Sequence, residues 1–148
     1  MILHAGLVAL RVQGRWLGAL ITGSSGLGKS DLMVRAFETG FRLVADDRTV
    51  VWASDGLAFG RAPQALDGLI ELRGLGVVSE PALPLTEIGL VVRCEQEPPE
   101  RMPEPELDLV AGLPTPVLRL TALEASAPAK LGRALSGLRR LGHGRGAA

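Results

Sequence analysis

The sequence contains the run Gly23-Ser24-Ser25-Gly26-Leu27-Gly28-Lys29-Ser30, which fits the phosphate-loop pattern Gly-x-x-x-x-Gly-Lys-Ser. The glycines of such a loop allow backbone N–H groups to converge on phosphate oxygens, while the lysine neutralises phosphate charge and the serine hydroxyl can ligate Mg²⁺. The motif therefore predicts a nucleotide site. The alternative is a glycine-rich turn with an incidental lysine, which the flanking sequence disfavours.

Both flanks of this run have the pattern that a phosphate loop requires. Residues Leu17–Thr22 are an apolar run typical of a buried strand. After the run, apolar residues recur at helical spacing until Gly40, a common helix stop; these residues are Leu32, Met33, Ala36 and Phe37. We therefore predict a strand, the loop and a helix in succession.

A β-hairpin is predicted ahead of the loop. Gly6–Val12 has the pattern of a strand, Gln13–Trp16 that of a tight turn, and Leu17–Thr22 forms the returning strand. Because the loop of ordinary phosphate-loop enzymes follows the first strand of a parallel sheet, a leading hairpin indicates a mixed β-sheet in an α/β fold. The hairpin also directs His4 towards the loop, although a lone histidine near a terminus is more often a surface residue.

The composition indicates a single folded domain. The chain has 148 residues, 47% of them hydrophobic, and we expect one domain over residues 1–141 followed by a flexible tail over 142–148. The net charge is zero, with 16 basic and 16 acidic side chains, so no global field attracts nucleic acid or an anionic membrane. Any partner must be recognised locally.

The cysteine content and the amino terminus bear on location. The single cysteine, Cys94, permits no internal disulfide, which fits a reducing compartment, and the cytoplasm is the default expectation. The apolar start of the chain lacks a basic segment and is broken by Arg11, so it is not a convincing signal peptide. No stretch of the sequence is long and apolar enough to span a bilayer.

Two adjacent carboxylates, Asp46 and Asp47, end the apolar run Phe41–Ala45. This pattern is expected for a buried strand whose carboxyl end reaches a nucleotide-bound metal. Close like charges push two pKa values apart, so one carboxylate can lie near Mg²⁺ while the other takes a proton from an attacking hydroxyl. The alternative is a strand-ending turn in which Arg48 pairs with either carboxylate.

A further segment combines charges with glycines. Glu71 and Arg73 stand two apart in an apolar stretch, so a strand there would place both side chains on one face. Gly74 and Gly76 leave room for a ligand or a backbone to approach. A charge pair on an exposed strand face would give the same pattern, and the residues alone do not choose between these interpretations.

The carboxyl-terminal half contributes scaffold and one isolated cation. Ile88–Cys94 predicts another buried strand, and Val117–Leu120 predicts a last one. Between them lies the acidic, proline-rich loop Glu95–Glu106, whose composition is that of a solvated connector. Arg101 is the lone cation of this loop, suited either to a structural salt link or to reaching a phosphate.

A helix is predicted near the end of the chain. Its start is indicated at Thr121, through the pattern Thr121-x-x-Glu124, or alternatively at Ser126 and Pro128. An apolar stripe follows and predicts that the helix docks on the core; the stripe consists of Leu131, Ala134, Leu135, Leu138 and Leu141.

In this order, the segments resemble one known family. The chain resembles the catalytic domain of HPr kinase/phosphorylase, the bacterial enzyme that phosphorylates a serine of the phosphocarrier protein HPr. The resembling features are His4 ahead of a hairpin, the Gly23–Ser30 loop, Arg42–Asp47 and Glu71–Gly76. The last of these, Glu-Leu-Arg-Gly-Leu-Gly, is similar to the family's Glu-Ile-Arg-Gly-Leu-Gly signature. It is the specific feature, because phosphate loops occur in many unrelated proteins.

The resemblance implies a fold, a reaction and a set of roles. The implied fold is a P-loop-containing mixed β-sheet with flanking helices, related to phosphoenolpyruvate carboxykinase, and the implied activity is that of an ATP-dependent protein-serine kinase. The Gly23–Ser30 loop would bind ATP phosphates, and Ser30 and Glu71 would bind Mg²⁺. The implied catalytic residues are His4, Lys29 and Arg101, together with the adjacent carboxylates Asp46 and Asp47, which would supply the general base. The implied partner is an HPr-like phosphocarrier protein of the phosphotransferase system, and family hexamers suggest a homo-oligomer.

The chain departs from the family pattern in two places. It begins almost at His4, which implies a short form consisting of the carboxyl-terminal catalytic domain only. Near Pro116–Arg119, the family's Pro-Val-Arg-Pro-Gly-Arg-Asn segment, linked to dephosphorylation, is largely absent, so we expect weak or absent phosphorylase activity. The alternatives are a small-molecule kinase and a non-catalytic nucleotide-binding regulatory module, and the intact carboxylates argue against the second.

Overall fold

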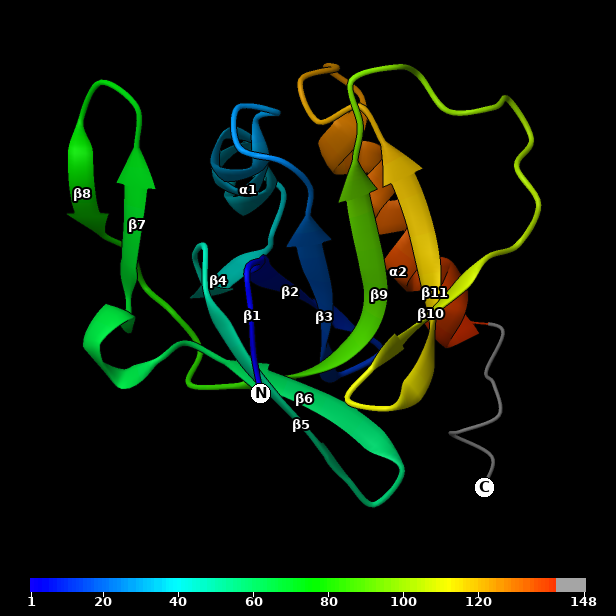
Figure 1. Cartoon of the computed structure of the whole chain (residues 1–148), viewed down its shortest axis with the longest axis horizontal. Helices are drawn as coiled ribbons and strands as arrows, with labels where there is room; N and C mark the ends of the chain where they lie inside the picture. The colour runs from blue at the N-terminus through cyan, green and yellow to red at the C-terminus, as the bar shows by residue number, and fades with distance from the viewer. Residues whose placement is uncertain (141–148) are drawn as a thin grey trace.

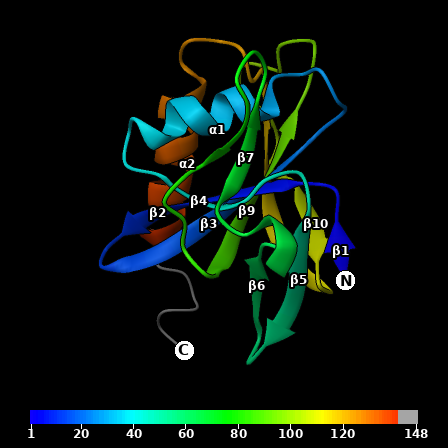
Figure 2. The same cartoon turned by 90° about the vertical axis from the view of Figure 1, so that its left-hand side faces the viewer.

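The fold is a curled, mixed β-sheet with two helices on one face, as the computed structural model of residues 1–140 shows (Figure 1 and Figure 2). The elements in chain order are β1 (Ile2–Leu3), β2 (Gly6–Val12), β3 (Arg15–Thr22), α1 (Lys29–Phe37), β4 (Arg42–Ala45), β5 (Thr49–Ser54), β6 (Leu57–Arg61), the 3₁₀ helix η1 (Gln64–Leu66), β7 (Leu69–Leu72), β8 (Gly76–Ser79), β9 (Thr86–Cys94), β10 (Leu107–Val110), β11 (Leu113–Leu120) and α2 (Ala127–Arg140). The tail expected over residues 142–148 lies outside the described residues.

Strand β9 is the centre of the sheet. It pairs in parallel with β3 along one edge and in parallel with β11 towards its carboxyl end, and its first residues pair antiparallel with β6. Strands β2 and β3 form the predicted antiparallel hairpin, and β2 also pairs antiparallel with β4. The prediction of a mixed sheet, with a hairpin ahead of residues Gly23–Ser30, is therefore confirmed.

The two faces of the sheet bury separate apolar cores. The first core contains the apolar faces of α1 and α2, including Leu32, Met33 and Leu131, packed on residues of β2, β3 and β9. The second core lies on the opposite face, where strands β2, β3, β5, β6 and β9 close over one another as the sheet curls. A strand that is buried on both faces needs a nearly continuous apolar sequence, which explains Leu17–Thr22 and Ile88–Cys94.

The helices begin and end where local chemistry allows. Gly28, with φ of 89°, caps the start of α1, and Gly40, with φ of 102°, follows its end as predicted. Of the proposed starts for α2, the structure supports Ser126, because its carbonyl accepts the hydrogen bond of Lys130 N–H at 2.9 Å. Within residues 1–140, neither helix combines the length and the hydropathy needed to cross a membrane.

Three segments differ from the sequence-based expectation. Strand β7 ends at Leu72, so Arg73 lies in the turn before β8 and does not share a strand face with Glu71. Strand β10 follows directly after the Glu95–Glu106 loop, in a stretch for which the sequence analysis predicts no element. Strand β11 begins at Leu113, well before Val117, because its first half pairs only with β10 and so tolerates two prolines that a central strand would exclude.

Leu131 offers a test of how α2 docks. Its side chain is fully buried in the first core, so Leu131→Ala removes packing and leaves a cavity. We expect a loss of about 2–5 kcal/mol in the free energy of unfolding, measured by urea denaturation. The control Leu107→Ala, at a side chain that is 65% exposed, should change stability by less than about 0.5 kcal/mol. Equal effects of the two substitutions would contradict the docked position of α2.

Candidate active site

The Gly23–Ser30 segment, called here the 23–30 loop, connects the end of β3 to the start of α1. Gly23 lies against β9, where a Cβ atom would come within 2.8 Å of the carbonyl oxygen of Cys94. Its φ of 139° and that of 89° at Gly28 also favour glycine. The tip, residues 24–26, is exposed, whereas Leu27 packs against the first core. The loop thus presents its backbone to solvent at the amino terminus of a helix, the arrangement that favours an anion.

The Lys29 side chain is folded over this loop. Its Nζ donates hydrogen bonds to the carbonyl oxygens of Gly23 at 2.6 Å and Ser24 at 3.0 Å. The ammonium group is therefore held beside the exposed tip, where it can neutralise a bound anion. The same charge acts weakly on Cys94, because burial dominates and raises the pKa of that thiol to about 11. Cys94 is accordingly a core residue rather than a nucleophile.

Asp46 joins three separate segments of the chain. Its Oδ1 accepts a hydrogen bond from Ser30 Oγ at 3.2 Å, and its Oδ2 accepts one from the backbone N–H of Glu71 at 3.0 Å. Burial raises the pKa of Asp46 above the ordinary aspartate value, and the negative charges of Asp47 and Glu71 add to this increase, while the two hydrogen bonds oppose it. The end of β4, the start of α1 and β7 therefore converge on one carboxylate.

The Asp47 side chain contacts His4, a different partner from those of Asp46. The distance between His4 Nε2 and Asp47 Oδ1 is 2.7 Å, and both side chains are more than half exposed. Asp47 has φ of 68°, a left-handed conformation that aspartate tolerates better than most residues. The pairing of β1 with β5 and the bond from Thr49 Oγ1 to Ala5 O, 2.8 Å long, hold the two segments together. The adjacent carboxylates thus point to different neighbours, which suits them to different roles.

Glu71 reaches the site from a separate two-stranded sheet. Strands β7 and β8 form a hairpin beside α1, at the left of Figure 1, and Ile70 of β7 is buried in the first core. The exposed side chain of Glu71 lies close enough for its charge to raise the pKa of Asp46. Arg73, Gly74 and Leu75 form the exposed turn of this hairpin.

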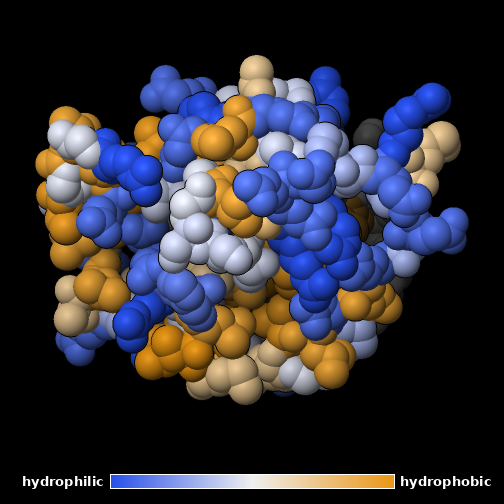
Figure 3. Space-filling view, turned by 45° about the horizontal axis from the view of Figure 1, so that its top comes forward, coloured by the Kyte–Doolittle hydropathy of each residue, from blue (hydrophilic) through white to orange (hydrophobic). Residues whose placement is uncertain are grey.

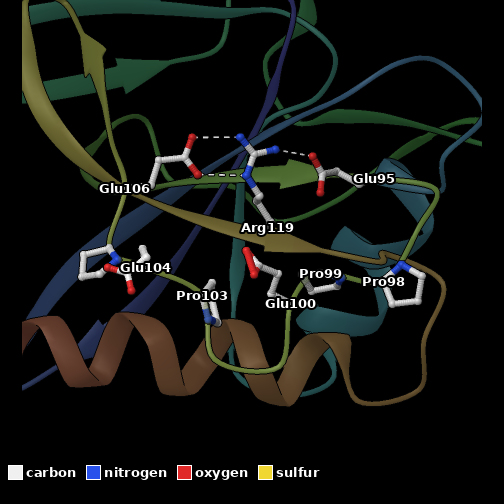
Figure 4. Close-up of a pocket in the computed structure, with 9 residues that line it drawn as sticks. Glu95, Pro98, Pro99, Glu100, Pro103, Glu104, Glu106 and Arg119 are labelled. Carbon is white, nitrogen blue, oxygen red and sulfur yellow. Dashed lines mark hydrogen bonds and ion pairs between the residues drawn. The ribbon is translucent and has the colours of Figure 1, made fainter.

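Arg101 is the predicted site residue that the structure does not bring to the others. It is exposed in the loop after β9, with no hydrogen bond or ion pair to another part of residues 1–140. The salt link considered for Arg101 is instead made by Arg119 of β11, whose guanidinium group donates to Glu106 at 2.8 and 2.9 Å and also to Glu95 (Figure 4). One arginine thereby joins the two ends of the acidic loop.

A cavity of about 470 Å³ lies beneath the acidic loop. Its lining consists of Glu95, Pro98, Pro99, Glu100, Pro103, Glu104, Pro105, Glu106 and Arg119 (Figure 4). None of the predicted site residues contributes to it. The hydrogen bonds from Arg119 lower the pKa of Glu106, and the hydrogen bond from Arg93 lowers the pKa of Asp108. No local sequence pattern predicts this network, because its arginines and carboxylates are far apart along the chain.

The donor atoms near Asp46 suit Mg²⁺. This cation prefers carboxylate and hydroxyl oxygens and usually takes only one or two carboxylates from the protein, with substrate phosphates and water completing its shell. Asp46, Ser30 Oγ and the nearby Glu71 form such a set. Residues 1–140 contain no cluster of three or more histidine, cysteine or acidic side chains placed to hold a metal by themselves. Around a Mg²⁺ ion held by these oxygens, the remaining positions would be filled by substrate phosphates and water.

Comparison with solved structures places the fold. The structure of the HPr(Ser) kinase/phosphatase from Coxiella burnetii matches with a TM-score of 0.79 over 97% of this chain and 99% of that chain, at 22% sequence identity. The mixed α/β domain with its curled sheet therefore has the fold of an HPr kinase.

Sequence comparison then gives the family. Residues 2–83 match the family model described as the HPr Serine kinase C-terminal domain, which is more than half of the 148 residues. This chain belongs to that family. The HPr kinase/phosphorylase of Clostridium novyi is 39% identical over 92 residues, covering 57% of this chain and 30% of that protein. The enzyme of the same name from Lacticaseibacillus casei is 34% identical over 133 residues, covering 81% and 40%. The chain thus spans less than half the length of either relative.

The hydrogen bonds to Asp46 predict how its titration responds to substitution. Removing the Ser30 hydroxyl by Ser30→Ala should raise the pKa of Asp46 further, because the carboxylate loses a donor, whereas Asp47→Asn should lower it by removing a like charge. Carboxyl NMR titration, with Asp46→Asn to assign the signal, measures both. Since the folded state holds this proton more tightly than the unfolded chain, stability from this group declines as the pH rises through the folded-state pKa. A lower pKa of Asp46 in Ser30→Ala, or a higher one in Asp47→Asn, would contradict the assigned contacts.

Proposed function

We propose that this chain is an ATP-dependent kinase that phosphorylates a serine of an HPr-like phosphocarrier protein of the phosphotransferase system. The observation that carries the proposal is the position of Asp46 and Asp47: one bonded to Ser30 of the 23–30 loop, the other bonded to His4. Family membership supports a kinase activity. We further propose that residues 1–141 form one catalytic domain and that the protein acts in the cytoplasm.

The 23–30 loop would hold the triphosphate of ATP. Its backbone N–H groups and the Lys29 ammonium face the phosphate oxygens, with Lys29 exchanging its present bonds to loop carbonyls for bonds to phosphate. Ser30, Asp46 and Glu71 would hold Mg²⁺, which, when bound, neutralises charge on the transferred phosphoryl group. Asp46, being the more buried carboxylate, suits this inner position.

Asp47 would act as the general base. The partner's serine hydroxyl attacks the γ-phosphorus; its proton passes to an oxygen of Asp47, the new O–P bond forms, and the bond to the β-phosphate oxygen breaks to release ADP. The 2.7 Å contact with His4 orients the Asp47 carboxylate, whose exposure leaves it open to a protein substrate. His4 or Arg101 would meet charge that develops on the transferred group. For Arg101 to take this role, the exposed loop that carries it would have to move towards the 23–30 loop.

The reverse reaction, phosphorolysis of the phosphoserine, has less support. It needs a second anion site, and the arginine retained in that part of the sequence, Arg119, is occupied by Glu95 and Glu106. A guanidinium group shared by two carboxylates has little charge left for an inorganic phosphate. This supports weak or absent phosphorylase activity.

The direct test is transfer of labelled phosphate from ATP. We expect labelled serine on an HPr-type protein with the unaltered chain, and no transfer with Lys29→Ala, because the substitution removes the charge that faces the phosphates. The melting temperature of Lys29→Ala should stay nearly unchanged, since the side chain bonds only to two carbonyl oxygens of the 23–30 loop. Labelled small molecules without labelled protein would favour a small-molecule kinase. ATP binding with no transfer to any acceptor would favour a regulatory module.

Asp47→Asn separates nucleotide binding from catalysis. We expect ATP to bind with unchanged affinity while transfer to serine falls at least about a hundredfold, because the amide cannot take the proton. The measurements are equilibrium binding and initial rates on one preparation. If Asp46→Asn shows this behaviour while Asp47→Asn remains active, the two roles are reversed.

The direction of the reaction is also testable. With a serine-phosphorylated partner and millimolar phosphate, we expect pyrophosphate release to be much slower than the forward transfer, because Arg119 is held by two carboxylates. Coupled detection of pyrophosphate measures the rate. Release as fast as the forward reaction would show that another residue, such as Arg73 or Arg101, supplies the anion site.

A further inference from the structure

The loop between β11 and α2, residues 121–126, lies next to the 23–30 loop. The reason is the register of three parallel strands: Thr22 of β3 is level with Arg93 of β9, which is level with Arg119 of β11. The carboxyl ends of these strands therefore meet at one edge of the sheet, the edge at which ligands bind in open α/β sheets. Figure 3, in which the top of Figure 1 comes forward, shows mostly hydrophilic side chains on this side, with a few apolar patches.

One apolar side chain of this loop contacts the 23–30 loop directly. A Cβ atom on Gly28 would come within 2.5 Å of Leu123 Cδ2, so Leu123 occupies the space that a side chain at Gly28 would need. Leu123 nevertheless remains 63% exposed. It therefore covers the backbone of Gly28 with one side and presents an apolar surface to solvent with the other.

The backbone around Leu123 is firmly held. The guanidinium group of Arg35 on α1 donates hydrogen bonds to the carbonyl oxygens of Ala122 and, at 3.1 Å, of Glu124, the residues on either side of Leu123. Glu124 N–H also bonds to Thr121 O at 3.1 Å, and Ala122 is buried. The exposure of Leu123 thus results from an anchored backbone rather than from a loose segment, which is the property of a preorganised binding surface.

The order of strands sets the direction of a bound nucleotide. The 23–30 loop follows β3, the carboxylate pair follows β4 on one side of β3, and Leu123 follows β11 on the other side. A triphosphate whose γ-phosphate faces Asp46 and Asp47 extends its opposite end away from β4. We propose that Leu123 is the surface on which the nucleoside of the bound nucleotide packs. This inference rests on the proposed function, because it requires a nucleotide with its γ-phosphate at the carboxylates.

The chemistry of Leu123 fits one task. An aliphatic side chain offers no hydrogen bond to the edges of a base, but it removes the apolar face of a base or a ribose from water. Leu123 therefore adds affinity for a nucleoside triphosphate over inorganic triphosphate without reading which base is present. The phosphate contacts of the 23–30 loop are the same for both ligands.

The experiment compares Mg·ATP with Mg·tripolyphosphate, which lacks the nucleoside, by equilibrium calorimetry on the whole chain. For the unaltered chain we expect ATP to bind at least about tenfold more tightly. Leu123→Ser should weaken ATP binding about tenfold and leave tripolyphosphate binding within about twofold. The control Leu109→Ser, at a β10 side chain that is 66% exposed, should change neither affinity.

Each other outcome has a distinct meaning. Equal affinities of the unaltered chain for the two ligands, or unchanged ATP binding by Leu123→Ser, would overturn the inference while leaving the proposed kinase intact. An equal loss for both ligands in Leu123→Ser would also overturn it, since Leu123 would then only shape the 23–30 loop around Gly28. Failure of the unaltered chain to bind either ligand would overturn the proposed function and the inference together.

Discussion

The parallel pairing of β9 with β3 and with β11 is the constraint on which the rest of the structure depends. Parallel neighbours end at the same edge of a sheet, so this pairing brings the 23–30 loop and the β11–α2 loop together. Strand β9 is also buried on both faces of the sheet, and its sequence is therefore long and mostly apolar. The antiparallel strands around it close the second core and deliver His4 and Asp46 to the same edge.

Within that frame, the polar site is assembled by short contacts between distant segments. The Asp46 carboxylate links the end of β4 to α1 and β7, and Asp47, the next residue, bonds to His4 between β1 and β2. Two neighbouring carboxylates with different surroundings are a common arrangement where one must hold a cation and the other a proton. Here the difference is one of burial: Asp46 is half-buried and Asp47 is exposed.

Much of this was predictable from the sequence, because local patterns determine local structure. The hairpin, the loop, α1 and the strand before Asp46 were all predicted from apolar spacing and glycine positions, and their bounds agree closely with the structure. The first half of β11 was hidden by its prolines, which argue against a strand unless the edge pairing with β10 is known. Pairings such as His4 with Asp47, or Arg119 with Glu95 and Glu106, depend on chain topology, and no local pattern encodes them.

The ion pairs of Arg119 with Glu95 and Glu106 affect how this fold can vary among related proteins. Since Glu95 and Glu106 both bond to the Arg119 guanidinium group, the residues between them form a surface loop whose two ends are held together. The positions of β9 and β10 therefore do not depend on the length of this loop, and lengthening a surface loop carries only a small entropic penalty. We therefore expect insertions and deletions to accumulate between these two glutamates, while the spacing from Cys94 to Glu95 and from Glu106 to β10 stays fixed.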